Sequence, residues 1–179
     1  MWLDPTEIPA ALALEANYAA IRAEWARLSL ADFVPWVIPE AYQGRWWLFP
    51  LLACNAGELG MVDVIARNRP RCPTTVALLA RMPGVTSAAF STLEPGAHIY
   101  PHVDHEAPVV YRVHLGIDAP DGGVFRVGAE TRRWADGRCL AFDGQTEHEG
   151  ANLGAQARTI LLLDIPIERI HESLAPATC

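Results

Sequence analysis

The sequence predicts a mainly β fold with helices confined to its N-terminal part. Before Gly84, apolar residues recur at helical spacing in an Ala- and Leu-rich stretch. After Gly84 the chain breaks into short apolar runs separated by Asp-Gly and Pro-Gly pairs, which are typical of turns between strands. Many short strands at regular spacing favour a double-stranded β-helix, the jelly-roll barrel of cupin-like proteins.

Three helices are expected before Gly84. The first covers 9–28, where Leu12, Ala16 and Ala19 share one helical face and Pro9 suits the first turn. The second covers 73–81 and ends at Pro83-Gly84. A weaker pattern indicates a helical stretch within 59–68.

Seven strands are expected after Gly84, at 87–93, 98–102, 109–117, 124–127, 131–134, 139–142 and 158–165. With 179 residues the chain is long enough for one well-buried core and too short for two ordinary domains. We therefore expect a single domain over 1–179, with a helical front at 1–84, a jelly-roll core at 85–167 and a short tail at 168–179.

Composition limits the classes of partner. The net charge is −7 and no basic run exists, so nucleic acid is not an expected partner. All 14 basic residues are Arg, which excludes a lysine Schiff base. No apolar run approaches the ~18 residues of a membrane span, and no signal pattern opens the chain. The cysteines lie far apart without CxxC spacing, so we expect reduced thiols and a cytoplasmic protein with no membrane partner.

A candidate metal site is formed by His102, Asp104 and His148. Two imidazoles and one carboxylate are the ligands of a mononuclear Fe(II) site that keeps coordination positions open for a co-substrate and O2. On an extended strand, residues two apart point to the same side, so His102 and Asp104 could reach one ion. Arg158 follows far enough along the chain to return on the next strand, where its guanidinium suits a carboxylate. Together these residues indicate an Fe(II)/2-oxoglutarate oxygenase.

Two further polar residues share one face of the strand expected at 109–117. Arg112 and His114 lie on that face, and Val113 and Leu115 lie on the other. A buried Arg and His are costly unless an anion neutralises them. The pair is either a satisfied structural pair at a strand end or a second carboxylate-binding group near Arg158.

Several ordered motifs resemble the aspartyl/asparaginyl β-hydroxylase family. They are STLEPGAHIYPH at 91–102, RVHLG at 112–116, VGAETRRW at 127–134, FDGQTEHE at 142–149 and RTILLLD at 158–164. The resemblance implies a jelly-roll fold, Fe(II), and 2-oxoglutarate as a co-substrate that is cleaved to succinate and CO2. It also implies that His102 and His148 bind the iron, that Ser91, Arg112, His114 and Arg158 hold 2-oxoglutarate, and that Trp46 lines the same pocket.

The chain departs from the family pattern in two places. Family members commonly carry Gly two residues after the first metal-binding His, where this chain has Asp104. Asp104 is therefore either the third metal ligand or a neighbouring carboxylate, with water completing the iron site. The segment that follows His102 is also longer, and it contains His105 and Glu106, which could face substrate or solvent.

The expected activity is hydroxylation of an unactivated C–H bond, with release of succinate and CO2. The expected substrate is an amino-acid-like small molecule or a peptide. Two rival functions use the same barrel: a non-catalytic cupin that binds a metal or a carboxylate, and a cupin isomerase or lyase. Asp143 and Asp164 are additional candidates, as carboxylates that fix a ligand His or an Arg. Trp134 is expected in the core or a lid.

Overall fold

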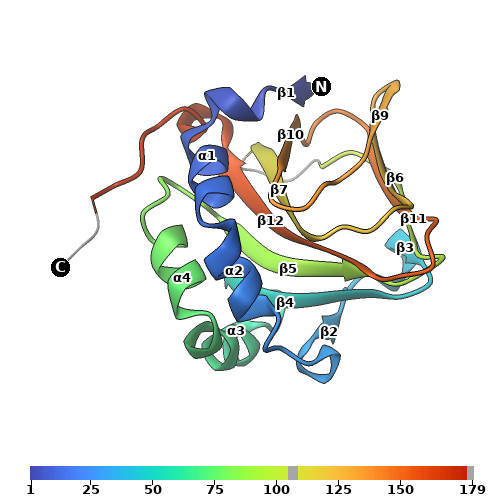
Figure 1. Ribbon diagram of the computed structural model, residues 1–179, viewed down its shortest axis with the longest axis horizontal. Helices are drawn as coiled ribbons and strands as arrows, with labels where there is room; N and C mark the ends of the chain where they lie inside the picture. The colour runs from blue at the N-terminus through green and yellow to red at the C-terminus, as the bar shows by residue number, and fades with distance from the viewer. Residues whose placement is uncertain (105–108, 177–179) are drawn as a thin grey trace.

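The computed structural model describes residues 1–104 and 109–176, which form two antiparallel sheets with helices on one side (Figure 1). The larger sheet has the order β1-β10-β7-β12-β5-β4-β2 and the smaller one the order β3-β6-β11-β8-β9. The strands of the larger sheet are β1 (Trp2–Leu3), β2 (Val34–Pro35), β4 (Trp46–Ala53), β5 (Ser87–Leu93), β7 (Val110–Asp118), β10 (Cys139–Asp143) and β12 (Arg158–Pro166). Those of the smaller sheet are β3 (Tyr42–Gln43), β6 (His98–His102), β8 (Gly123–Val127), β9 (Glu130–Arg132) and β11 (His148–Asn152).

The larger sheet is buried on both faces. One face packs against α1 (Pro9–Ala16), α2 (Tyr18–Trp25) and α4 (Pro73–Leu79), with Val113 and Leu115 of β7 in that core. The other face meets the smaller sheet, where Phe125, Trp134 and Phe142 pack together. The expected alternation along β7 is therefore correct, and its polar face lies between the two sheets.

All seven expected strands are present, β5 and β6 with the expected bounds. The jelly-roll, mainly β fold class predicted from the sequence is confirmed. Five strands were not expected: β1, β2, β3, β4 and β11. The largest of them, β4, is apolar without alternation because it is buried on both faces. Its register with β5 shifts between Pro50 and Leu52, where the proline lacks a donor for the ladder.

The helices differ from the expected pattern in one place. The helix expected over 9–28 is two helices, α1 and α2, separated at Asn17. The side-chain amide of Asn17 donates a hydrogen bond of 2.8 Å to the carbonyl oxygen of Ala13, and such side-chain bonds compete with a continuous helix. The other two expected helices are α3 (Val62–Asn68) and α4. Short 3-10 turns lie at Pro5–Glu7, Leu30–Asp32, Pro39–Ala41, Arg69–Arg71 and Ile167–Arg169.

The segment before Gly84 is not only helical, because it also supplies β1 to β4. Of these, β4 pairs with β5 along its whole length, and β1 pairs with β10. No helix in the described residues is long and apolar enough to cross a membrane.

Candidate metal centre and carboxylate pocket

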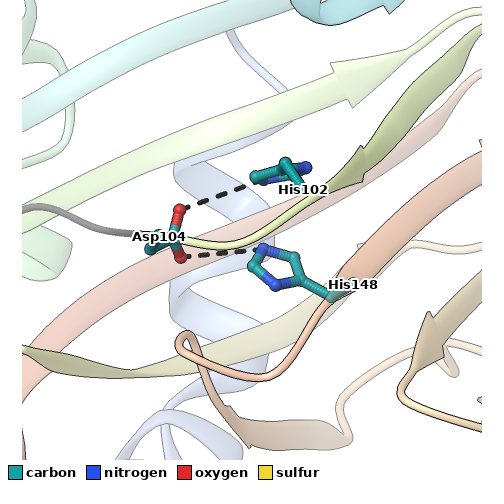
Figure 2. A group of neighbouring side chains, drawn as sticks. All are labelled: His102, Asp104 and His148. Atoms are coloured by element: carbon teal, nitrogen blue, oxygen red, sulfur yellow. Dashed lines mark ion pairs between the residues drawn. The ribbon is translucent and has the colours of Figure 1, made fainter.

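His102, Asp104 and His148 lie together between the two sheets (Figure 2). One potential ligand atom from each residue falls within 4.8 Å of the others. The nearest Asp104 oxygens are 3.9 Å from His102 Nε2 and 3.6 Å from His148 Nε2. The predicted trio is therefore brought together with its donor atoms converging on one point.

Both histidine rings are oriented in the same way. Nδ1 of His102 is 2.7 Å from the carbonyl oxygen of Tyr100, and Nδ1 of His148 is 2.9 Å from that of Thr146. A carbonyl oxygen can only accept, so Nδ1 carries the hydrogen in each ring. In the neutral ring this tautomer leaves the lone pair on Nε2, which faces the Asp104 carboxylate, as a metal-binding imidazole requires.

A β-bulge turns His102 into the site. His102 pairs with His148, and Ile99 pairs with Gly150, so three steps along β6 match two steps along β11. Ile99 is buried and points inward, so regular alternation would direct His102 outward. The extra residue at Tyr100–Pro101, both exposed, restores His102 to the inner face.

Asp104 is not placed in the site by the strand alternation that the sequence suggested. It lies beyond the end of β6, so it is not paired with His102 as two residues of one strand. Its backbone N–H donates to the carbonyl oxygen of Gly144 at 3.0 Å. A Cβ on Gly144 would be 2.7 Å from Asp104 Oδ2, so only glycine leaves room for the carboxylate there.

The donor atoms at the centre of the trio are suited to a cation. Among the described residues, Asp104 Oδ2 and His148 Nε2 are buried without a hydrogen-bond partner. Burial lowers the pKa of His148 to about 4, so its imidazole is neutral and its lone pair is available at neutral pH. Unsatisfied buried acceptors are rare in proteins, and two of them converging with a third ligand fit a divalent metal.

One cavity joins the two histidines of this trio to the other predicted residues. It contains about 390 Å³ of space not filled by protein atoms, part of it open to solvent. Its walls include seven of the predicted site residues: Trp46, Ser91, His102, Arg112, His114, His148 and Arg158. Five apolar or aromatic residues that the sequence did not single out as site residues complete it: Ile99, Phe125, Trp134, Ile160 and Leu162. Hydrophobic side chains in a cavity carry no signal in one sequence, because they resemble core residues.

Arg158 is the most deeply buried cation of the cavity, with 1% of its surface exposed. Its guanidinium lies 4.1 Å from the centre of the Trp134 ring, and one Nη donates to the carbonyl oxygen of Ser91 at 3.3 Å. No described residue accepts a hydrogen bond from its Nε. Burial lowers the pKa of Arg158 to about 9, which leaves it charged at neutral pH. A buried guanidinium in this state has the charge and geometry to pair with a carboxylate.

Ser91 and Trp46 lie beside Arg158. The indole N–H of Trp46 donates to Ser91 Oγ at 2.9 Å, so the hydroxyl is held in place and its own hydrogen can point elsewhere. Trp46 is stacked against Trp36, with ring centres 4.9 Å apart. These residues form a rigid wall at the Arg158 end of the cavity.

Arg112 and His114 occupy different surroundings although they share one strand face. Nε of Arg112 donates to Asp164 Oδ1 at 3.0 Å and is 3.3 Å from Asp104 Oδ2. His114 packs edge-on against Phe125 and Phe142, and burial keeps its pKa well below the usual value, so it is neutral. Asp164 therefore fixes an arginine, as expected for one of the additional acidic candidates. His105 and Glu106 lie outside the described residues.

The fold and the site together define a jelly-roll protein with a candidate metal centre inside the barrel. A 2OG-Fe(II) oxygenase family oxidoreductase from Burkholderia pseudomallei superposes with a TM-score of 0.53 at 18% identity, over 82% of this chain and 76% of that one. A Pseudomonas putida prolyl-4-hydroxylase also gives a TM-score of 0.53, at 16% identity, over 87% of this chain and 86% of that one. These likenesses establish the fold.

Residues 15–167 match the family model for aspartyl/asparaginyl β-hydroxylases, and the chain belongs to that hydroxylase family. It is 32% identical to an ornithine lipid ester-linked acyl 2-hydroxylase of Rhizobium tropici over 90% of this chain and 58% of that protein. It is also 32% identical to the human aspartyl/asparaginyl β-hydroxylase, over 62% of this chain and 15% of that protein. The chain thus spans little more than half the length of the first of these relatives and far less of the second.

Proposed function

We propose that the protein is an Fe(II)- and 2-oxoglutarate-dependent hydroxylase that oxidises an unactivated C–H bond. The observation that carries this proposal is that the two histidines of a convergent His-His-Asp trio line the same cavity as a buried Arg158, whose Nε has no acceptor among the described residues. A protein that only holds a metal has no need of a buried arginine without an acceptor. A protein that binds a metal-chelating co-substrate with a carboxylate at its far end needs both the metal ligands and the arginine.

His102, Asp104 and His148 would hold the iron, each through an atom that already faces the centre of the trio. When bound, iron would couple two reactions of O2: the oxidative cleavage of 2-oxoglutarate to succinate and CO2, and the insertion of the second oxygen atom into a substrate C–H bond. The protein's residues supply geometry and a dry cavity. His102 and His148 keep Nε2 unprotonated through their Nδ1 hydrogen bonds.

Arg158 and the Ser91 hydroxyl would bind the distal carboxylate of 2-oxoglutarate. Trp46 orients Ser91, and Trp134 covers the guanidinium face and excludes water from it. Neutral His114 would border the co-substrate from β7, where its Nδ1 has no hydrogen-bond partner among the described residues.

The substrate class we propose is an amino-acid-like small molecule or a peptide. Membership in a family named for hydroxylation of aspartyl and asparaginyl groups supports this choice. The Rhizobium relative is named for a lipid acyl chain, so an acylated amino acid belongs in the same substrate panel.

The test is succinate release by the purified protein with Fe(II), O2 and 2-oxoglutarate, in the presence of a panel of amino acids, peptides and acylated amino acids. Succinate formation that requires both Fe(II) and 2-oxoglutarate, together with a substrate product 16 mass units heavier, supports the proposal. Metal binding without succinate release would instead favour a non-catalytic cupin. Turnover of a substrate without 2-oxoglutarate would favour an isomerase or lyase.

A further inference from the structure

Arg112 lies between two carboxylates at the edge of the metal centre. Its Nε is 3.0 Å from Asp164 Oδ1 and 3.3 Å from Asp104 Oδ2. Asp104 in turn faces both histidines of the trio. The order of groups is therefore Asp164 on β12, Arg112 on β7, Asp104 just after β6, and then the two histidines, His102 on β6 and His148 on β11.

The two carboxylates are not equivalent partners of Arg112. Nε carries one hydrogen, and that hydrogen is directed to Asp164. Asp104 Oδ2 receives no hydrogen bond from any described residue, although it is close to the positive charge. Arg112 consequently attracts the Asp104 carboxylate without occupying the lone pairs of Oδ2, which remain available to a cation.

Asp104 is held in this place from the other side by backbone. Its N–H is bonded to the Gly144 carbonyl oxygen, and the absent Gly144 side chain makes room for Oδ2. The carboxylate is thus confined between the Gly144 backbone and the Arg112 guanidinium, with His148 Nε2 3.6 Å away.

We propose that Arg112 is a positioning residue for Asp104, which serves as the third metal ligand, and that Asp164 holds Arg112 in the orientation this role requires. The inference rests on the metal centre of the proposed function. This role adds to the direct binding of the co-substrate that its strand face and the family resemblance imply for Arg112, which also lines the cavity. Arg158 then remains as the principal cation for 2-oxoglutarate.

Net charge has to be controlled in the test. Removing Arg112 alone leaves a negative charge next to a cation site, which by itself would favour metal binding. The paired variant Arg112→Met/Asp164→Asn removes one charge of each sign, so a change in metal affinity then reports the position of Asp104. A matched control is Arg71→Met/Asp32→Asn, which removes another partly exposed ion pair, outside the cavity.

The experiment is calorimetric titration of Mn2+ into the full chain without 2-oxoglutarate, because Mn2+ is redox-stable and binds similar ligands. We expect the paired variant to bind Mn2+ about 10- to 100-fold more weakly than wild type, as is usual when a partner of a metal ligand is lost. The control pair should bind Mn2+ as wild type does. In an Asp104→Ala background the paired substitution should cause no further loss, since its effect acts through Asp104.

Arg112→Lys provides a second, milder variant if the paired one does not fold, because it keeps the positive charge but lacks the Nε–H that Asp164 accepts. Its ammonium group cannot reproduce the placement of the guanidinium between the two carboxylates, so Mn2+ affinity should fall in this variant too. The absorption spectrum of bound Co2+ should change in the same sense as in Asp104→Ala, because both variants disturb the same ligand.

Three results would overturn the inference. One is unchanged Mn2+ affinity in these variants together with a large loss of 2-oxoglutarate affinity in the Mn2+-loaded protein. This result would mean that Arg112 binds the co-substrate and does not position Asp104. Another is an equal loss of Mn2+ affinity with and without Asp104. The third is a wild-type protein that binds no Mn2+, which removes the metal centre and the proposed function with it, and is therefore distinct from the first two.

Discussion

The two histidines of the candidate metal centre combine an Nδ1 that contacts a backbone carbonyl oxygen with an Nε2 that faces Asp104. His148 is buried with Nδ1 bonded to a carbonyl and Nε2 facing Asp104. We expect His148→Ala to abolish high-affinity Mn2+ binding and 2-oxoglutarate turnover while the circular dichroism spectrum stays that of a folded barrel. His98→Ala is the matched control, because His98 lies on the same sheet but contacts Glu149 instead. Near wild-type metal affinity in the His148 variant would remove it from the ligands.

Arg158 is expected to determine the affinity for 2-oxoglutarate. Removing one partner of a buried ion pair costs about 3–5 kcal/mol, which corresponds to a loss of at least two orders of magnitude in affinity. Arg158→Ala should therefore raise the apparent KM for 2-oxoglutarate strongly with little effect on Mn2+ binding. The exposed Arg138 offers the control Arg138→Ala. If both variants have the same apparent KM for 2-oxoglutarate, Arg158 does not bind its carboxylate.

The sequence could predict the charged residues of the site but not all of the contacts between them. His102, His148 and Arg158 were recognisable because few other chemistries combine them in that order. Asp104 was expected from alternation along a strand, yet the structure holds it through Gly144, a residue distant in sequence. The pairing of Arg112 with Asp164 depends on the register of β7 and β12, which one sequence does not specify.

At the scale of elements, α4 begins with a cap that comes from another helix. Both carboxylate oxygens of Glu24 on α2 accept backbone hydrogen bonds, from Thr74 at 2.6 Å and Thr75 at 2.9 Å. The Thr75 hydroxyl adds a third bond of 2.7 Å. Burial alone would raise the pKa of Glu24, but these hydrogen bonds outweigh it and hold the pKa below its usual value near 4.5. The ionised Glu24 therefore joins α2 to the positive end of α4.

We expect Glu24→Gln to lower the free energy of unfolding by about 1.5–3 kcal/mol at neutral pH, since it removes charged hydrogen bonds at a buried helix end. Because the pKa of Glu24 is lower in the folded state, its contribution is complete above the unfolded value and is lost as the pH falls through the folded one. The difference between wild type and variant in urea unfolding should thus shrink below about pH 4. Glu58→Gln, at an exposed position, should show no such difference.

Strands were predictable where turns and alternation marked them, as for β5 and β7. The sequence did not reveal β4, because a strand buried on both faces shows no alternation. It also missed β11, since its consecutive residues Gly150 and Ala151 carry almost no side chain and leave no apolar alternation to recognise. The bulge in β6 that turns His102 inward was equally invisible, because it is defined by pairing with β11.

At the scale of the whole molecule, the candidate metal ligands join segments that only folding brings together. A metal that binds the folded barrel and not the unfolded chain stabilises the protein by mass action, by about 2.7 kcal/mol at 100 times Kd. For a chain of this size we expect Mn2+ at that concentration to raise the Tm by about 5–10 °C. Differential scanning calorimetry with and without Mn2+ measures the shift. His148→Ala should show none, and a shift retained in that variant would indicate a different metal site.

The pairing of β4 with β5 also determines how the chain can be shortened. If residues 1–84 were removed, β5 would lose its neighbour and present a long row of unpaired backbone groups, next to the apolar face that the helices normally cover. Such exposed edges template intermolecular pairing. We expect a fragment that begins at residue 85 to self-associate into β-rich aggregates, detectable by light scattering and thioflavin fluorescence. The N-terminal segment would in that case protect the barrel that contains the candidate metal site from aggregation.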